Sequence, residues 1–125
     1  MTVGIAQATA VAILKVFAGT AYAAVSTCTA KLHVGDPGAA GTANPSLGSA
    51  AANAVAWTTP TTPTMNASAV PAWTNGGTSE NISHVSLWNG ATFLQSIALT
   101  TPQAWVGTNT LTLTALSLNY SPIAA

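Results

Sequence analysis

Residues 82–99, ISHVSLWNGATFLQSIAL, decide the fold because they have the pattern of an antiparallel hairpin. The first seven residues alternate between two faces, one with Ile82, His84, Ser86 and Trp88 and the other with Ser83, Val85 and Leu87. Asn89-Gly90 follows, and both residue types tolerate the positive φ that a type I′ turn requires. The sequence therefore predicts that strand 91–99 returns antiparallel to strand 82–88.

Further strands are predicted on both sides of this hairpin. Residues 26–34 alternate with a period of two and predict a half-buried strand, and residues 35–46, which are rich in Gly and Pro, predict a loop. Strands are also predicted at residues 52–57, 64–73 and 108–120, the last with a bulge near Ala115-Leu116. One helix is predicted over residues 3–18, where good helix formers precede Gly19.

About six or seven short strands at this spacing are typical of a sandwich or jelly roll. We therefore expect a mainly β protein, an antiparallel β-sandwich with jelly-roll-like topology and one N-terminal α-helix. A chain of 125 residues suits a single domain, residues 1–125. Within it, residues 1–24 hold the helix and its connection, and residues 25–125 form the sandwich.

Charged residues are nearly absent from this chain. Lys15, Lys31, Asp36 and Glu80 are the only four, 3% of the sequence, where ordinary domains carry roughly a quarter. Nucleic acid and anionic membranes bind patches of Lys and Arg, so we expect neither as a partner. A surface with so little charge does not keep copies apart, which favours a protein that packs against other copies in an assembly.

The same scarcity leaves few side chains for chemistry, so no catalytic residue, metal site or cofactor is predicted and the protein is not expected to be an enzyme. His33 and His84, with Asp36 or Glu80, supply the ligand types of a facial metal triad, but nothing in their spacing calls for one. Asp36 precedes Pro37-Gly38, where a carboxylate accepts backbone N–H groups and fixes a loop. Cys28 is the only cysteine, so a disulfide within the chain is excluded.

Four tryptophans leave two interpretations open. Indole rings form core wedges between sheets or fill subunit interfaces. Exposed rings of Trp73 and Trp105 would instead provide a platform on which sugar rings stack, as in a glycan- or receptor-binding module.

The candidate assembly interface lies on the helix and on a Pro-rich segment. Ala6, Ala10, Ile13 and Phe17 recur at the spacing of one helix face. Pro60 and Pro63 keep residues 58–63 extended without pairing in a sheet. Both segments present apolar surface that one thin sandwich does not hide entirely, so we expect other copies to cover it.

Several stretches together resemble a family of small virion structural proteins of tailed bacteriophages. They are the opening Ala-rich helix, residues 31–33 leading into 35–42 (GDPGAAGT), residues 82–88 with Phe93-Leu94, residues 99–102 (LTTP), residues 111–113 and the closing PIAA. These stretches keep their order and span nearly the whole chain. Such proteins usually carry an Arg shortly after the DPG loop, whereas this chain has SAAAN at residues 49–53.

The resemblance implies a non-enzymatic building block of a virus particle. Its partners would be other copies of itself and other virion proteins, the major capsid or tail proteins. It would decorate the head surface as a capsid decoration protein, or form part of the tail as a minor tail or tail-fibre protein. Glycan or receptor recognition at a tail or fibre is the alternative, with a host surface glycan as partner.

Overall fold

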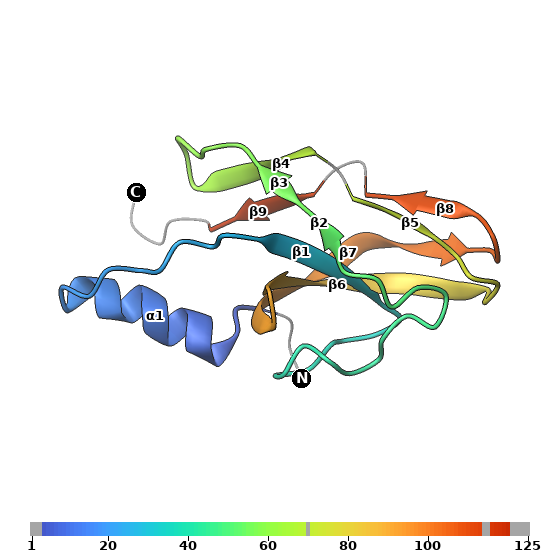
Figure 1. Cartoon of the computed structure of the whole chain (residues 1–125), viewed down its shortest axis with the longest axis horizontal. Helices are drawn as coiled ribbons and strands as arrows, with labels where there is room; N and C mark the ends of the chain where they lie inside the picture. Colours follow the sequence, from blue (N-terminus) through green and yellow to red (C-terminus); the bar gives the residue numbers. More distant parts are fainter. Residues whose placement is uncertain (1–3, 70, 114–115, 121–125) are drawn as a thin grey trace.

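The computed structural model describes residues 4–69, 71–113 and 116–120, and it confirms a mainly β fold with one N-terminal helix (Figure 1). The predicted hairpin consists of β6 (Glu80–Asn89) and β7 (Thr92–Trp105), which pair antiparallel. Gly90 in the turn has a φ of 57°, a left-handed conformation that glycine adopts without strain. The predicted hairpin is therefore confirmed, but its turn differs. Asn89 pairs with Thr92 and has no positive φ, so the two turn residues are Gly90 and Ala91 and not the predicted Asn89-Gly90. Strand β6 runs beyond both of its predicted ends, and β7 runs beyond its predicted C-terminal end.

The hairpin forms half of a four-stranded antiparallel sheet with the order β2-β1-β6-β7. Strand β1 (Cys28–His33), which the sequence predicted, pairs with β6 along its full length, from Cys28 opposite Asn89 to His33 opposite His84. Strand β2 (Asn53–Ala54) pairs with the other side of β1. This sheet is the first layer of the molecule.

A bulge in β7 changes the face on which Ile82 lies. Ile82 pairs with Gln103 while His84 pairs with Ala98, so residues 99–102 stand opposite Ser83 alone. Ile82 consequently packs in the same core cluster as Val85 and Leu87. The predicted alternation is wrong at this position, because extra residues in one strand interrupt the period of two.

The second layer contains a strand pair that is interrupted once. Strand β4 (Thr64–Ala69) pairs with β9 (Ser117–Asn119), and β5 (Ala72–Thr74) pairs with β8 (Thr110–Thr112). The last pair of the first ladder is Asn66 with Ser117, and the first pair of the second ladder is Ala72 with Thr112. One segment therefore advances by six residues and the other by five between the ladders, so the register shifts by one residue. The predicted strands 64–73 and 108–120 therefore run side by side with a break. The bulge predicted near Ala115-Leu116 includes Ala115, which lies outside the described residues.

The predicted strand 52–57 is divided between the two layers. Its first part, β2, pairs with β1, whereas β3 (Ala56–Trp57) pairs with β4. Val55 between them is buried, at the point where the chain crosses from one layer to the other. The prediction of one continuous strand is wrong here, because the chain changes sheets.

The hydrophobic core lies between the two layers, which Figure 1 shows stacked. Its buried members come from both sheets and from the segments that join them: Ala30, Leu32, Val55, Trp73, Ile82, Val85, Leu87, Trp105, Leu111, Leu113 and Leu116. This arrangement is a β-sandwich. The jelly-roll topology stays a prediction, since the described strands form sheets of four, three and two strands.

Helix α1 (Gln7–Phe17) is shorter than predicted and lies at one end of the sandwich (Figure 1). Residues 4–6 attach it to the outer edge of β7 through Ala6 N to Leu94 O and Ser96 N to Gly4 O, both 2.8 Å. None of the residues of α1 is buried. In the part of the chain that is described, this helix is too short to cross a membrane.

Candidate functional site

The outer face of the first sheet carries a buried polar network around Ser86. The Ser86 Oγ lies 2.7 Å from His33 Nε2 and 2.7 Å from Trp88 Nε1, and His33 Nδ1 lies 2.8 Å from the carbonyl oxygen of Ala43. Since a carbonyl only accepts, His33 Nδ1 donates to it and Nε2 accepts from the Ser86 hydroxyl. The same hydroxyl oxygen accepts the indole N–H of Trp88. Every polar atom of the network is satisfied when His33 is neutral.

The environment of His33 favours this neutral form. Burial lowers the pKa of His33 below its usual 6.5, and nearby His84 and Lys31 add to the effect, although hydrogen bonds with the Ala43 and Asn44 backbone oppose it. The Lys31 ammonium lies 4.5 Å from the Trp88 ring centroid, within the range of a cation–π interaction. The lysine thus covers the indole ring from the solvent side while the network stays uncharged.

The loop after β1 is fixed by Asp36, whose Oδ1 accepts the Gly38 N–H at 2.8 Å while its backbone oxygen accepts from Asn44 Nδ2 at 2.9 Å. This is the hydrogen bond that the Asp-Pro-Gly pattern predicts. Gly41, at the far end of the loop, has a φ of 72° and faces the ring of Phe93 so closely that a Cβ would overlap it. The loop therefore packs over the same outer face as His33.

Glu80 holds a second loop, a role that the sequence analysis missed. Its carboxylate accepts hydrogen bonds from the Ser46 hydroxyl and from the backbone N–H groups of Leu47 and Gly48, the last two at 3.0 Å. Because the partners lie 32 to 34 residues away in the sequence, no local pattern predicts them. The carboxylate joins the start of β6 to the turn before β2.

The histidines and carboxylates do not converge on a metal site. His33 and His84 are directly opposite in β1 and β6, but His33 binds Ser86 and Ala43 while His84 Nδ1 lies 2.8 Å from Ser83 Oγ. Over the described ranges of the chain, no group of three or more His, Cys, Asp or Glu side chains is placed to hold a metal ion. The geometry gives no support to the metal alternative.

Trp73 and Trp105 lie in the core, with 1% and 3% of their surface exposed. Their indole N–H groups donate to Ala51 O and Asn109 O, both at 2.9 Å. A sugar ring needs an open aromatic face, so the proposed glycan platform on these two residues is wrong. Both rings fill the space between the sheets, as the alternative interpretation predicted.

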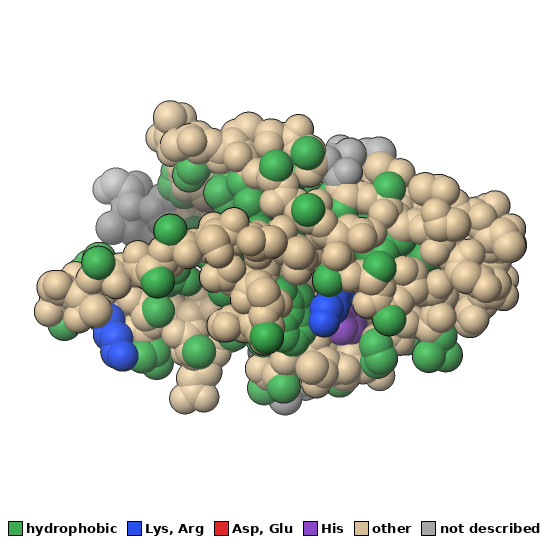
Figure 2. Space-filling view, viewed as in Figure 1, with side chains coloured by type: hydrophobic (Ala, Val, Ile, Leu, Met, Phe, Trp, Pro, Cys, Tyr) green, Lys and Arg blue, Asp and Glu red, His purple; other side chains and the backbone are tan. Residues whose placement is uncertain are grey.

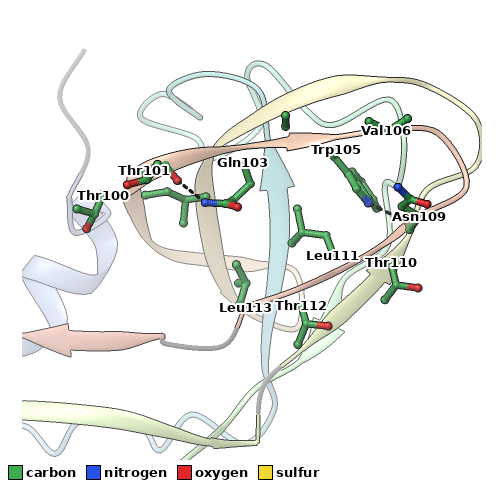
Figure 3. A pocket seen from close by; sticks show the side chains of 12 residues that line it. Thr100, Thr101, Gln103, Trp105, Val106, Asn109, Thr110, Leu111, Thr112 and Leu113 are labelled. Carbon is green, nitrogen blue, oxygen red and sulfur yellow. Dashed lines mark hydrogen bonds between the residues drawn. The ribbon is translucent and has the colours of Figure 1, made fainter.

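Trp105 forms part of the floor of an open groove of about 550 Å³ between the end of β7 and β8 (Figure 3). Polar side chains on its rim include Thr100, Thr101, Gln103, Asn109, Thr110 and Thr112. No charged side chain lines it, and Gln103 Nε2 donates to Thr101 O at 2.9 Å. The groove is therefore neutral and rich in hydroxyl and amide groups.

The predicted helix face is divided between the protein and solvent. Ala6 is buried against the sandwich, Ala10 and Ile13 are half-buried, and Phe17 is 88% exposed. The exposed large apolar residues of α1 are instead Val11, Leu14, Val16 and Phe17. Val11, Leu14 and Phe17 follow one another at intervals of three residues and are therefore neighbours on the helix surface, and we call these three the α1 outer face. Ala6 is therefore not available to another copy, whereas the assembly roles of Ala10, Ile13 and Phe17 stay a prediction.

Pro60 and Pro63 are exposed, as an assembly segment requires, and their role in assembly stays a prediction. Charged side chains take up little of the face that Figure 2 shows, where uncharged polar and hydrophobic atoms dominate. The sequence composition predicted this surface. The exposed apolar groups are concentrated on α1 and on the segment that follows it, where Tyr22 and Val25 are also exposed.

A family model described as "Podophage GP4 fiber I protein gp80" matches residues 4–121, almost the entire chain. No curated protein matches the chain. The match agrees with the predicted resemblance to a virion structural protein of a tailed phage. It names a fibre protein and does not distinguish the decoration and minor-tail alternatives within that prediction.

Proposed function

We propose that this chain, which belongs to the podophage GP4 fiber I protein gp80 family, is a structural subunit of a phage fibre that associates with other copies of itself. Family membership makes the chain a virion protein of the phage tail, and a fibre protein contacts other virion proteins. Head decoration, the other alternative from the sequence, gains no support from the family description. The subunit role needs no catalysis, and we extend the proposal to a non-enzymatic protein.

The observation that carries this proposal is the α1 outer face. Leu14 is 66% exposed and Val11 43%, next to Phe17 at the end of the same helix. Removing apolar surface from water stabilises an association by roughly 25 cal/mol per Å². An exposed apolar stripe of this kind marks an interaction site in a soluble protein. A contact without charges also keeps its strength when the salt concentration changes.

The roles of the ionisable groups support the non-enzymatic part of the proposal. His33 is neutral and engaged on both ring nitrogens, and the Glu80 carboxylate is engaged by three donors. Asp36 fixes its own loop. Each of these groups binds other parts of the protein. His33 also lines a small pocket of about 150 Å³, but both of its ring nitrogens are engaged by Ala43 and Ser86.

Sedimentation velocity of the purified full chain tests self-association. The native chain is expected to form an oligomer, and a Val11→Gln, Leu14→Gln double variant is expected to sediment as a monomer with an unchanged circular dichroism spectrum. Leu47→Gln is the matched control, because Leu47 is 78% exposed but lies in the loop held by Glu80. A native chain that stays monomeric at the highest soluble concentration would refute self-association.

A second candidate function, recognition of a neutral glycan, is favoured by the groove between β7 and β8. Hydroxyl and amide groups on its rim match the donors and acceptors of a sugar, and its lining carries no charge. A glycan array tests it, with Gln103→Ala and Thr112→Val expected to abolish any signal. Thr92→Val, in the first residue of β7, is the control. An array without a signal for the native chain would count against this candidate.

A further inference from the structure

An apolar pocket of about 560 Å³ opens where α1 meets the end of the sandwich. Its walls come from both layers, from the helix and from the connection after it: Thr9, Ile13, Tyr22, Cys28, Trp57 and Leu94 are among them. No charged side chain or histidine lines it. Its size falls in the range of pockets that enclose a ligand or a large side chain.

Phe17 is a complementary projection on the same chain. It is the last residue of α1 and has 88% of its surface exposed, the largest fraction among the large hydrophobic residues that the structure describes. The inner residues Thr9 and Ile13 of α1 face the pocket, but Phe17 does not line it. Within the described residues, Phe17 is thus an aromatic side chain outside any cavity, and the apolar pocket has no side chain that fills it.

We propose that Phe17 of one copy inserts into the α1 pocket of a second copy. This inference rests on the proposed self-association and names the contact that produces it. The chemistry of the two parts agrees, because an uncharged aromatic side chain enters an uncharged apolar cavity and no ionised group is desolvated. Insertion covers the most exposed large hydrophobic residue and the open end of the core together.

Interface area connects this contact to the α1 outer face. One aromatic side chain buries about 150–250 Å². A stable interface buries roughly 800 Å² on each partner, so Phe17 alone is not sufficient. Leu14 and Val11 continue from Phe17 at intervals of three residues along α1 and supply further exposed apolar area next to the insertion. Phe17 is then the central anchor of a larger contact that continues along the helix.

Cys28 lines the pocket and is the only cysteine, which allows a direct test. An Ala18→Cys, Cys28→Ser double variant, which keeps Phe17, is mixed with the native chain and treated with a short bis-maleimide. Each partner then has one thiol, so a mixed covalent dimer reports only contact between residue 18 of one copy, next to Phe17, and residue 28 of another. A Leu47→Cys, Cys28→Ser variant is the control for random collision, because Leu47 is exposed elsewhere.

The expected result is a mixed dimer well above the control yield. Phe17→Ser without any thiol change is expected to weaken self-association by about 30-fold, as for a central aromatic anchor. Control-level cross-linking together with undiminished association of Phe17→Ser would overturn this inference and leave the proposed self-association standing. A monomeric native chain would refute both. A co-purified apolar small molecule in the pocket, found by native mass spectrometry, would also overturn the insertion.

Discussion

Replacing Ser86 with alanine is expected to destabilise the fold strongly, because one hydroxyl satisfies two buried groups. Ser86 has no exposed surface, and its Oγ lies 2.7 Å from both His33 Nε2 and Trp88 Nε1. Ser86→Ala leaves His33 Nε2 and the indole N–H of Trp88 without hydrogen-bond partners. An unsatisfied buried polar group costs about 1–3 kcal/mol, so for two groups we expect a loss of about 2–6 kcal/mol in the free energy of unfolding. That loss is a large part of the roughly 5–15 kcal/mol that stabilises a domain.

Urea denaturation followed by tryptophan fluorescence and circular dichroism measures this loss. Ser83→Ala is the matched control, since it removes a hydroxyl from the same strand. Ser83 Oγ lies 2.8 Å from His84 Nδ1 at a partly exposed position, where water replaces the lost partner. The control is expected to lose less than about 1 kcal/mol. Equal losses for the two variants would refute the conclusion that the Ser86 network is a buried, fully satisfied unit.

Three further perturbations test the loops and the histidine. Gly41→Ala should destabilise more than Gly38→Ala: both residues have φ near 70°, which costs an alanine about 1–2 kcal/mol, but only at Gly41 does a Cβ overlap Phe93. Equal losses in urea would show that the ring moves aside. Glu80→Gln should lower the free energy of unfolding by about 1–3 kcal/mol, because the new side-chain NH2 group then faces one of the three donors. The same variant should show faster hydrogen exchange at the backbone amides of Leu47 and Gly48. Unchanged exchange would contradict the role assigned to Glu80. The pKa of His33 is lowered in the folded state, so below pH 6.5 the unfolded chain binds more protons than the folded chain. The free energy of unfolding should therefore fall as the pH drops through 6.5 toward the pKa of His33 in the folded state. The slope should reach at most about 1.4 kcal/mol per pH unit and should flatten in His33→Gln; an unchanged slope would assign the effect to another group.

The elements that local sequence patterns govern were predicted well. Asn89-Gly90 located the hairpin because Gly90 adopts a positive φ in the turn, although Asn89 does not and belongs to β6. The alternation from Cys28 located β1, and the Ala-rich start located α1. The Asp36 side chain makes the loop hydrogen bond that its position before Pro37 predicts, since both partners are neighbours in the sequence.

Features that depend on contacts between distant residues were not predictable in the same way. The bulge opposite Ser83 is a property of two strands together, so the position of Ile82 could not be found from β6 alone. The change of sheet at Val55 likewise needs partners in both layers. Composition indicated exposed apolar surface on the helix. Only the packing of Ala6 against β7 determines which side of α1 faces solvent.

The attachment of the N-terminal segment has a mechanical consequence. Ala6 N to Leu94 O, Ser96 N to Gly4 O and Gly4 N to Ser96 Oγ join this segment to the outer edge of β7. A pulling force applied to the chain N-terminal to Gly4 would act on these three hydrogen bonds first, and on α1 and the β1–β6 ladder only afterwards. Because these hydrogen bonds would break first, the N-terminal segment would separate from β7 and lengthen the subunit while the sandwich stayed folded.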